Sequence, residues 1–105
     1  MLFNEVQKQH TTPARADLLV GMARVDMHRR NYPEALRLLE SADLFWRDFD
    51  PDNRWAGETA LWLGRCYSAL GREAEGAEAL SRAAKLLAAS RIPTDNELVR
   101  PTHQR

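Results

Sequence analysis

The fold is decided by two stretches that carry the same pattern of small and apolar residues, ADLLVGMARVDMHRRNYPEALRLLESADLFW at residues 16–46 and GETALWLGRCYSALGREAEGAEALSRAAKLL at residues 57–87. Equivalent positions are separated by a constant 41 residues, so that Leu39 corresponds to Leu80 and Ala42 to Ala83. A constant spacing over this length is typical of one structural unit used twice. We therefore expect two similar units that stack on each other to bury their apolar faces.

The first unit, at about residues 13–47, is predicted to contain two helices. Thr12 can cap the first helix and Pro13 suits its first turn, where no amide donor is needed, so this helix is expected to run to about Arg29. Pro33 opens the second helix, which is expected to end near Arg47.

The second unit, at about residues 54–90, is predicted to repeat this arrangement. An Asp- and Pro-rich turn at residues 48–53 separates the units, and Asp52 or Asn53 can cap the third helix. Gly71 is suited to the left-handed conformation that ends a helix, and the fourth helix is expected to follow it and to end near Ser90.

Apolar residues that recur every three or four positions predict the inward faces of these helices. In the first helix these residues are Leu18, Leu19, Met22, Ala23 and Val25. In the second they are Leu36, Leu38, Leu39, Ala42, Leu44, Phe45 and Trp46, with Glu34, Arg37, Glu40 and Asp43 in solvated positions. In the third they are Trp55, Ala60, Leu63, Tyr67 and Leu70. In the fourth they are Ala74, Ala77, Leu80, Ala83, Leu86 and Leu87.

Both ends of the chain carry weaker signals. Leu2, Phe3 and Val6 would share one helical face, so residues 1–11 are a candidate capping helix. Thr94 and Glu97 have the spacing of a capping box, which predicts a short turn or helix within residues 91–105 before a polar tail.

Composition narrows the possible functions. Fifteen basic residues balance fifteen acidic ones, and no Lys or Arg run is long enough to follow a phosphate backbone, so neither nucleic acid nor a membrane is an expected partner. No apolar run approaches the ~20 residues that span a bilayer, and the first ten residues do not form a secretion signal, which favours a cytoplasmic protein. The single Cys66 excludes an internal disulfide and agrees with a reduced compartment.

The second unit resembles the tetratricopeptide repeat. The resemblance rests on Leu63, Gly64, Tyr67, Gly71, Gly76, Leu80 and Ala83. In the first unit Leu19, Met22, Ala23, Ala35, Leu39 and Ala42 fill the corresponding places, but Asp26 stands where the pattern has an aromatic residue. The 41-residue offset exceeds the usual period of about 34 residues and is similar to the longer kinesin-light-chain type of repeat. The resemblance implies an all-α, right-handed α-α superhelix of two helical hairpins, with flanking helical segments, that binds other proteins.

In tetratricopeptide arrays the first helix of each unit lines a concave groove. The resemblance therefore implies these partner-binding residues: Asp17, Val20, Arg24, Met27 and His28 in the first unit, and Glu58, Leu61, Arg65 and Ser68 in the second. Arg24 and Arg65 are equivalent, and two guanidinium groups side by side could bind a carboxylate-bearing peptide through paired hydrogen bonds. The alternative is that each arginine pairs with a neighbouring acid such as Asp17 or Glu58.

Three tryptophans lie around the turn between the units, and core packing is expected for at least two of them. Trp46 and Trp62 are candidate interface residues, because tryptophan is enriched at the centres of protein interfaces. Two units are fewer than the three or so that usually form a stable array. We therefore expect the exposed ends to be covered by the flanking segments or by a second copy in a homodimer, or the chain to belong to a longer array.

Other kinds of site have little support. Asp48, Asp50 and Asp52 have the spacing that opens a calcium loop, but Asn53 and Thr59 stand where that loop needs Gly and Glu, so a turn and helix cap is favoured. The three histidines are scattered, and no nucleophile–base pair or phosphate loop is present. No catalytic residue, metal or cofactor is predicted. We interpret the chain as a non-catalytic protein-interaction module that self-associates or binds a peptide or protein partner; a helix-turn-helix DNA-binding domain is the alternative.

Overall fold

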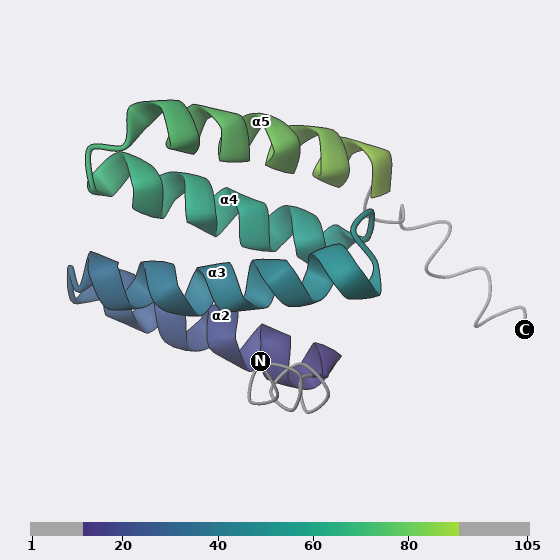
Figure 1. Ribbon diagram of the computed structural model, residues 1–105, viewed down its shortest axis with the longest axis horizontal. Helices are drawn as coiled ribbons and strands as arrows, with labels where there is room; N and C mark the ends of the chain where they lie inside the picture. The colour runs from purple at the N-terminus through teal and green to yellow at the C-terminus, as the bar shows by residue number, and fades with distance from the viewer. Residues whose placement is uncertain (1–11, 91–105) are drawn as a thin grey trace, which may run out of the picture.

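The computed structural model describes residues 12–90, which form four α-helices: α2 (Pro13–His28), α3 (Tyr32–Phe49), α4 (Arg54–Ala69) and α5 (Glu73–Ser90). The helices α2 and α3 form one antiparallel hairpin, and α4 and α5 form the other. The two hairpins join where α3 packs against α4, and α4 also touches α2 (Figure 1). The predicted all-α class and the pair of hairpins are confirmed. The segments predicted at residues 1–11 and 91–105 lie outside the described residues.

The predicted helix ends are confirmed closely at three of the four helices. The Thr12 hydroxyl accepts a hydrogen bond from the Arg15 amide at 3.1 Å, and the Asn53 side-chain oxygen accepts one from the Ala56 amide at 2.8 Å. Gly71 adopts φ +81° after α4, a conformation that favours glycine. The exception is α3, which continues to Phe49, two residues beyond the predicted end. Phe49 lies on Phe45, with ring centroids 5.1 Å apart, and this contact supports the additional residues.

The main core lies between the hairpins and draws residues from all four helices. Ala23 of α2, Leu39 of α3, Leu63 of α4 and Ala79 of α5 belong to one buried cluster. Small residues permit the close approach of α4 and α5, where Gly64 lies against the side chain of Leu80. The two units therefore share one core, as the repeated apolar pattern predicts.

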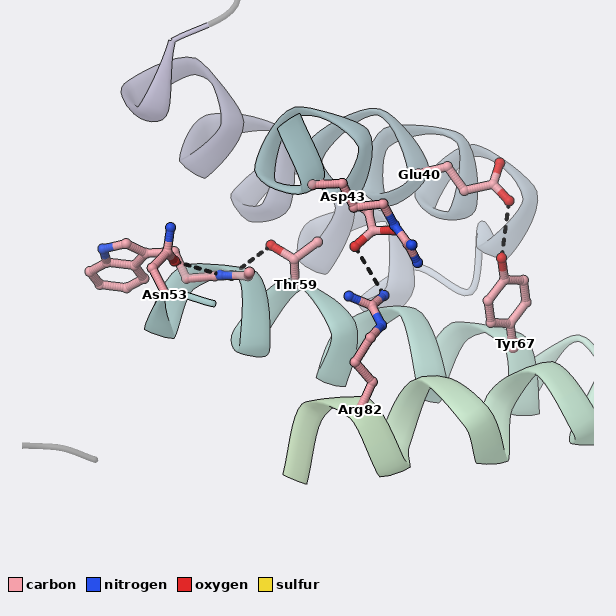
Figure 2. A network of polar contacts seen from close by, with 9 residues as sticks. Glu40, Asp43, Asn53, Thr59, Tyr67 and Arg82 are labelled. Atoms are coloured by element: carbon pink, nitrogen blue, oxygen red, sulfur yellow. Dashed lines mark hydrogen bonds and ion pairs between the residues drawn. The ribbon is translucent and has the colours of Figure 1, made fainter. Parts of the chain in front are cut away.

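Figure 2 shows two of the polar contacts that cross from the first hairpin to the second. The Tyr67 hydroxyl donates to the Glu40 carboxylate at 3.2 Å, which connects α4 to α3. The Arg82 guanidinium donates to the Asp43 carboxylate at 3.0 Å, which connects α5 to α3. The prediction that Asp43 is solvated is wrong, because this residue is buried between Arg82 and its helical neighbour Arg47, at 2.8 Å. Partners of opposite charge offset the cost of removing the carboxylate from water.

The predicted inward face of α2 is also wrong in part. The buried residues of this helix are Ala16 and Ala23, whereas Leu18, Met22 and Val25 are exposed. The spacing of these three residues places them on one face of the helix, and no other described helix covers that face. Periodicity identifies apolar faces, but it does not tell which of them the rest of the chain covers.

Similar corrections apply to the outer sides of α3, α4 and α5. Leu44 and Trp55 were predicted to face inward and are exposed. On α5 the buried face carries Ala79 and Ala83, while Ala74 and Ala77 lie at the surface; Leu80 faces Gly64 of α4 as predicted, but 37% of its surface remains exposed. The side of α5 away from α4 has no described helix against it, so apolar residues remain on the outside there.

Candidate ligand groove between α2 and α4

The equivalent arginines Arg24 and Arg65 meet on one tryptophan ring. The guanidinium carbon of Arg24, from α2, lies 4.6 Å from the centre of the Trp62 ring. The guanidinium carbon of Arg65, from α4 itself, lies 4.8 Å from the same ring. Both distances are within the range of a cation–π contact. The structure thus brings together the two residues that the sequence singled out, with a candidate interface tryptophan between them.

Neither arginine is neutralised by a neighbouring acid in the part of the chain that the structure describes. Glu58, one of the two acids expected to compete for them, instead forms an ion pair with Arg54 at 3.3 Å. Asp17, the other, is exposed and forms no ion pair within residues 12–90. Two positive charges therefore share one ring without a carboxylate between them, an arrangement that attracts anions.

An open groove of about 540 Å³ adjoins this pair. One wall is formed by residues 21–28 of α2, and the other is the half-buried side chain of Trp62 in α4. The lining residues are Gly21, Arg24, Val25, Met27, His28 and Trp62. Gly21 has no heavy atom near the position that a Cβ would take, so the backbone of α2 is accessible there. The groove therefore combines positive charge, an aromatic surface and apolar side chains.

The other predicted partner-binding residues are less concentrated. Met27 and His28 line the groove, whereas Val20 packs against the core. Leu61 is half-buried, and the Ser68 hydroxyl would lie only 2.7 Å from a Cβ added at Gly76, so that Ser68 faces α5 rather than α2. Of the nine predicted residues, Arg24, Met27 and His28 line the groove. Arg65 is not a lining residue but lies on the Trp62 ring that forms one wall.

The three tryptophans have different environments. Trp46 is buried, with 3% of its surface exposed, and lies within the core cluster at the end of α3. Trp55 is exposed and carries the Arg54 guanidinium at 5.3 Å. Trp62 alone of the three lines the groove, so it is the candidate interface tryptophan that a ligand could reach. The sequence did not indicate that Trp62 lies between the two arginines.

Cys66 is a packed core residue rather than a reactive one. Its side chain is fully buried, and the thiol donates to the Tyr32 carbonyl at 3.4 Å. Burial raises the pKa of the Cys66 thiol above its ordinary value, and the nearby Glu40 carboxylate raises this pKa further. Because the thiolate is the reactive form, a raised pKa and burial both slow alkylation.

We expect the Cys66 thiol of the folded protein to react slowly with a disulfide reagent at neutral pH and rapidly after unfolding in denaturant. Absorbance of the released thiolate measures both rates. Equal rates in the two states would contradict the buried position of Cys66.

The described residues show no sign of a metal site or a membrane span. Within residues 12–90, no three His, Cys, Asp or Glu side chains come together in a way that could hold a metal ion. In the same range no helix has both the length and the apolar character needed to cross a bilayer. The turn containing Asp50 and Asn53 is held by its own hydrogen bonds, with the Asn53 side-chain amide donating to the Asp50 carbonyl at 2.9 Å.

Comparison with known proteins adds no assignment. No protein-family model, no curated protein and no solved structure matches the chain. A functional interpretation therefore rests on the groove and the packing of its helices.

Proposed function

We propose that the protein is a non-catalytic interaction module that binds an acidic segment of a peptide or protein partner in the groove between α2 and α4. The observation that carries this proposal is the pair of guanidinium groups, Arg24 and Arg65, on one Trp62 ring without a carboxylate partner among the described residues. An acidic ligand would supply the missing charge.

The chemistry of the three side chains suits such a ligand. A guanidinium presents a planar set of N–H donors that matches a carboxylate with two parallel hydrogen bonds. The indole ring holds both guanidinium groups near each other and supplies a flat apolar surface beside them. A peptide with carboxylates and an adjacent apolar residue would use the charge of Arg24 and Arg65 and the apolar contacts of Val25 and Met27.

The charge distribution of the hairpins agrees with this choice. Residues 12–31, which include α2, contain four arginines and two aspartates, although the whole chain has no net charge. An acidic partner would therefore approach the α2 side of the molecule under a favourable field, and its association would weaken as salt screens that field.

The arrangement of the helices is consistent with a tetratricopeptide-like, right-handed superhelix as the framework. In that framework α2 and α4 are the first helices of their units and line the concave side, where ligands of such arrays bind. The constant 41-residue offset, the two hairpins and the contact of α4 with both α2 and α3 support this interpretation.

The test is binding to an array of synthetic peptides that includes acidic, neutral and basic sequences with the same apolar residues. We expect the array to retain acidic peptides. We expect R24Q/R65Q to weaken that binding by roughly ten- to a hundred-fold, because the double variant removes at least one hydrogen bond between a guanidinium and a carboxylate. R37Q is the matched control, because Arg37 is an exposed arginine of α3 that pairs with Glu34 outside the groove.

Equal binding of acidic and neutral peptides would contradict the proposal, as would unchanged binding by R24Q/R65Q. Salt-dependent retention of duplex DNA, with no retention of acidic peptides, would instead favour the helix-turn-helix alternative.

A further inference from the structure

The exposed face of α2 is apolar and lies beside the groove, which it meets at Val25. Leu18, Met22 and Val25 are 56%, 47% and 50% exposed, and their spacing of four and three residues aligns them along the helix. Large apolar side chains gathered on one face of a helix are typical of an interface. The buried side of α2 is made mainly of alanines, so this helix exposes its larger apolar residues instead of burying them.

The repeat shows what kind of surface these residues form. The residues 41 positions later are Thr59, Leu63 and Cys66. These three are almost completely buried, with at most 3% of their surface exposed, on the side of α4 that meets the first hairpin. The exposed face of α2 therefore corresponds to the face of α4 that a preceding hairpin covers.

At the opposite end of the molecule, residues of α5 are exposed although their equivalents in α3 are buried. Leu36 and Leu39 of α3 are buried in the core between the hairpins, but their equivalents in α5 are not: Ala77 is exposed, and Leu80 is 37% exposed although its side chain also lies against Gly64 of α4. Asp43 is likewise buried, whereas its equivalent Ala84 is exposed. The outer face of α5 thus corresponds to the face of α3 that a following hairpin covers.

We propose that a second copy of this chain docks head to tail, with the α5 end face of one molecule covering the α2 end face of the next. The α2 end face is formed by Leu18, Met22 and Val25, and the α5 end face by Ala77, Leu80 and Ala84. The contact would reuse the packing that already joins α3 to α4 within one molecule. The large residues of α2 would lie on Ala77 and Ala84 of α5, beside the partly exposed Leu80, as complementary surfaces do.

Charge disfavours the symmetric alternative, in which α2 packs on α2 of a second copy. An antiparallel pair centred on Met22 would place Arg15 of each copy opposite Arg29 of the other, so like charges would meet at both ends of the contact. In contrast, α5 contains three glutamates against one arginine and one lysine. Its slight negative charge complements the positive charge of residues 12–31.

Because the two end faces differ, an oligomer of any length still has one free α2 end face and one free α5 end face, to which another molecule can bind. Such heterologous contacts form open chains unless the rotation happens to close a ring. We therefore expect a series of oligomers that grows with concentration, rather than a single dimer. The contact shares Val25 with the groove but uses neither of the two groove arginines, so the loss of acidic-peptide binding and the loss of self-association are separable by variants.

The test is sedimentation of the full chain and of two variants that each carry a glutamate on one end face. We expect the average mass of the wild-type protein to rise between micromolar and millimolar concentration. Met22→Glu blocks the α2 end face and Ala77→Glu blocks the α5 end face, so each variant alone is expected to remain a monomer. An equimolar mixture is expected to form a dimer and nothing larger, because one intact face of each type remains.

The controls separate this contact from folding and from ligand binding. Ala74→Glu places the same charge on α5 three residues before Ala77. The equivalent residue in the first unit, Pro33, remains exposed although the second hairpin packs on the first, so position 74 is expected to lie outside the contact. This variant is therefore expected to assemble like the wild type. R24Q/R65Q is also expected to keep the self-association while losing acidic peptides. Circular dichroism establishes that each variant is folded.

A wild-type protein that stays monomeric throughout the concentration range would overturn the inference; the α2 end face would then be covered by another part of the chain or by a different protein. A wild-type dimer that does not grow further, together with no dimer in the mixture of the two variants, would show a symmetric interface instead.

Discussion

Leu39→Ala is expected to lower the free energy of unfolding by about 2–5 kcal/mol, the range for removing a large aliphatic side chain from a packed core. Leu39 has no exposed surface and belongs to the cluster that joins the two hairpins. The substitution would leave a cavity between α3 and its neighbours, where helices fixed on several sides cannot close in on the gap. Urea unfolding followed by circular dichroism measures the loss.

The matched control is Leu80→Ala, the equivalent substitution in the second unit. Leu80 is 37% exposed, so its removal costs less apolar burial than removal of Leu39. Both unfolding curves should be measured at the same low concentration, so that the proposed self-association does not contribute to the difference. A loss at Leu80 as large as the loss at Leu39 would contradict the position of Leu39 at the junction of the hairpins and Leu80 at an end.

Gly64→Ala is expected to destabilise the protein by about 1–3 kcal/mol, the usual cost of inserting a methyl group into a filled space. A Cβ at this position would lie 2.5 Å from the Leu80 Cγ and 3.1 Å from the carbonyl oxygen of Gly76. Because one of these atoms belongs to the backbone of α5, the two helices would have to separate. Thermal unfolding would show the effect as a lower Tm.

Gly21→Ala provides a control with the opposite sign. A Cβ at Gly21 meets no heavy atom within 4 Å, and the residue lies inside α2. Alanine should therefore stabilise that helix by roughly 0.5–1 kcal/mol relative to glycine. In addition, the G64A/L80A double variant should cost less than the sum of its single variants, because Leu80→Ala removes part of the clash. Additive losses would contradict the close contact between Gly64 and Leu80.

Much of the fold could be predicted from the sequence because its signals are local. Thr12 and Asn53 cap helices with their own side chains, and Gly71 ends one through its backbone conformation, so each can be recognised without knowledge of the rest of the chain. The constant offset added the relation between the two hairpins. These features depend on neighbours in the sequence or on a simple repeat.

The exposure of individual residues could not be predicted in the same way. Leu18 and Met22 have the spacing of core residues, yet they are exposed because no other described helix covers that face of α2. Asp43 has the character of a surface residue, yet it is buried because Arg82 of a different helix reaches it. In both cases the outcome depends on a contact between distant parts of the chain.

The candidate groove was predicted in part. The offset and the tetratricopeptide resemblance together paired Arg24 with Arg65, but the ring that holds them, Trp62, is adjacent to the expected inward register of α4 and was identified only as an interface candidate. Its position between the two guanidinium groups follows from how α2 and α4 are placed side by side. No local sequence pattern predicts that α2 and α4 lie side by side at this point.

The most direct test of the acidic-ligand groove is the nuclear magnetic resonance spectrum of the three tryptophan indole N–H groups during titration with an acidic peptide selected from the array. We expect the Trp62 signal to move with the bound fraction, while the signals of the buried Trp46 and of Trp55, neither of which lines the groove, stay in place. R24Q/R65Q should abolish the movement. Saturable binding of the peptide with an unchanged Trp62 signal would contradict the account.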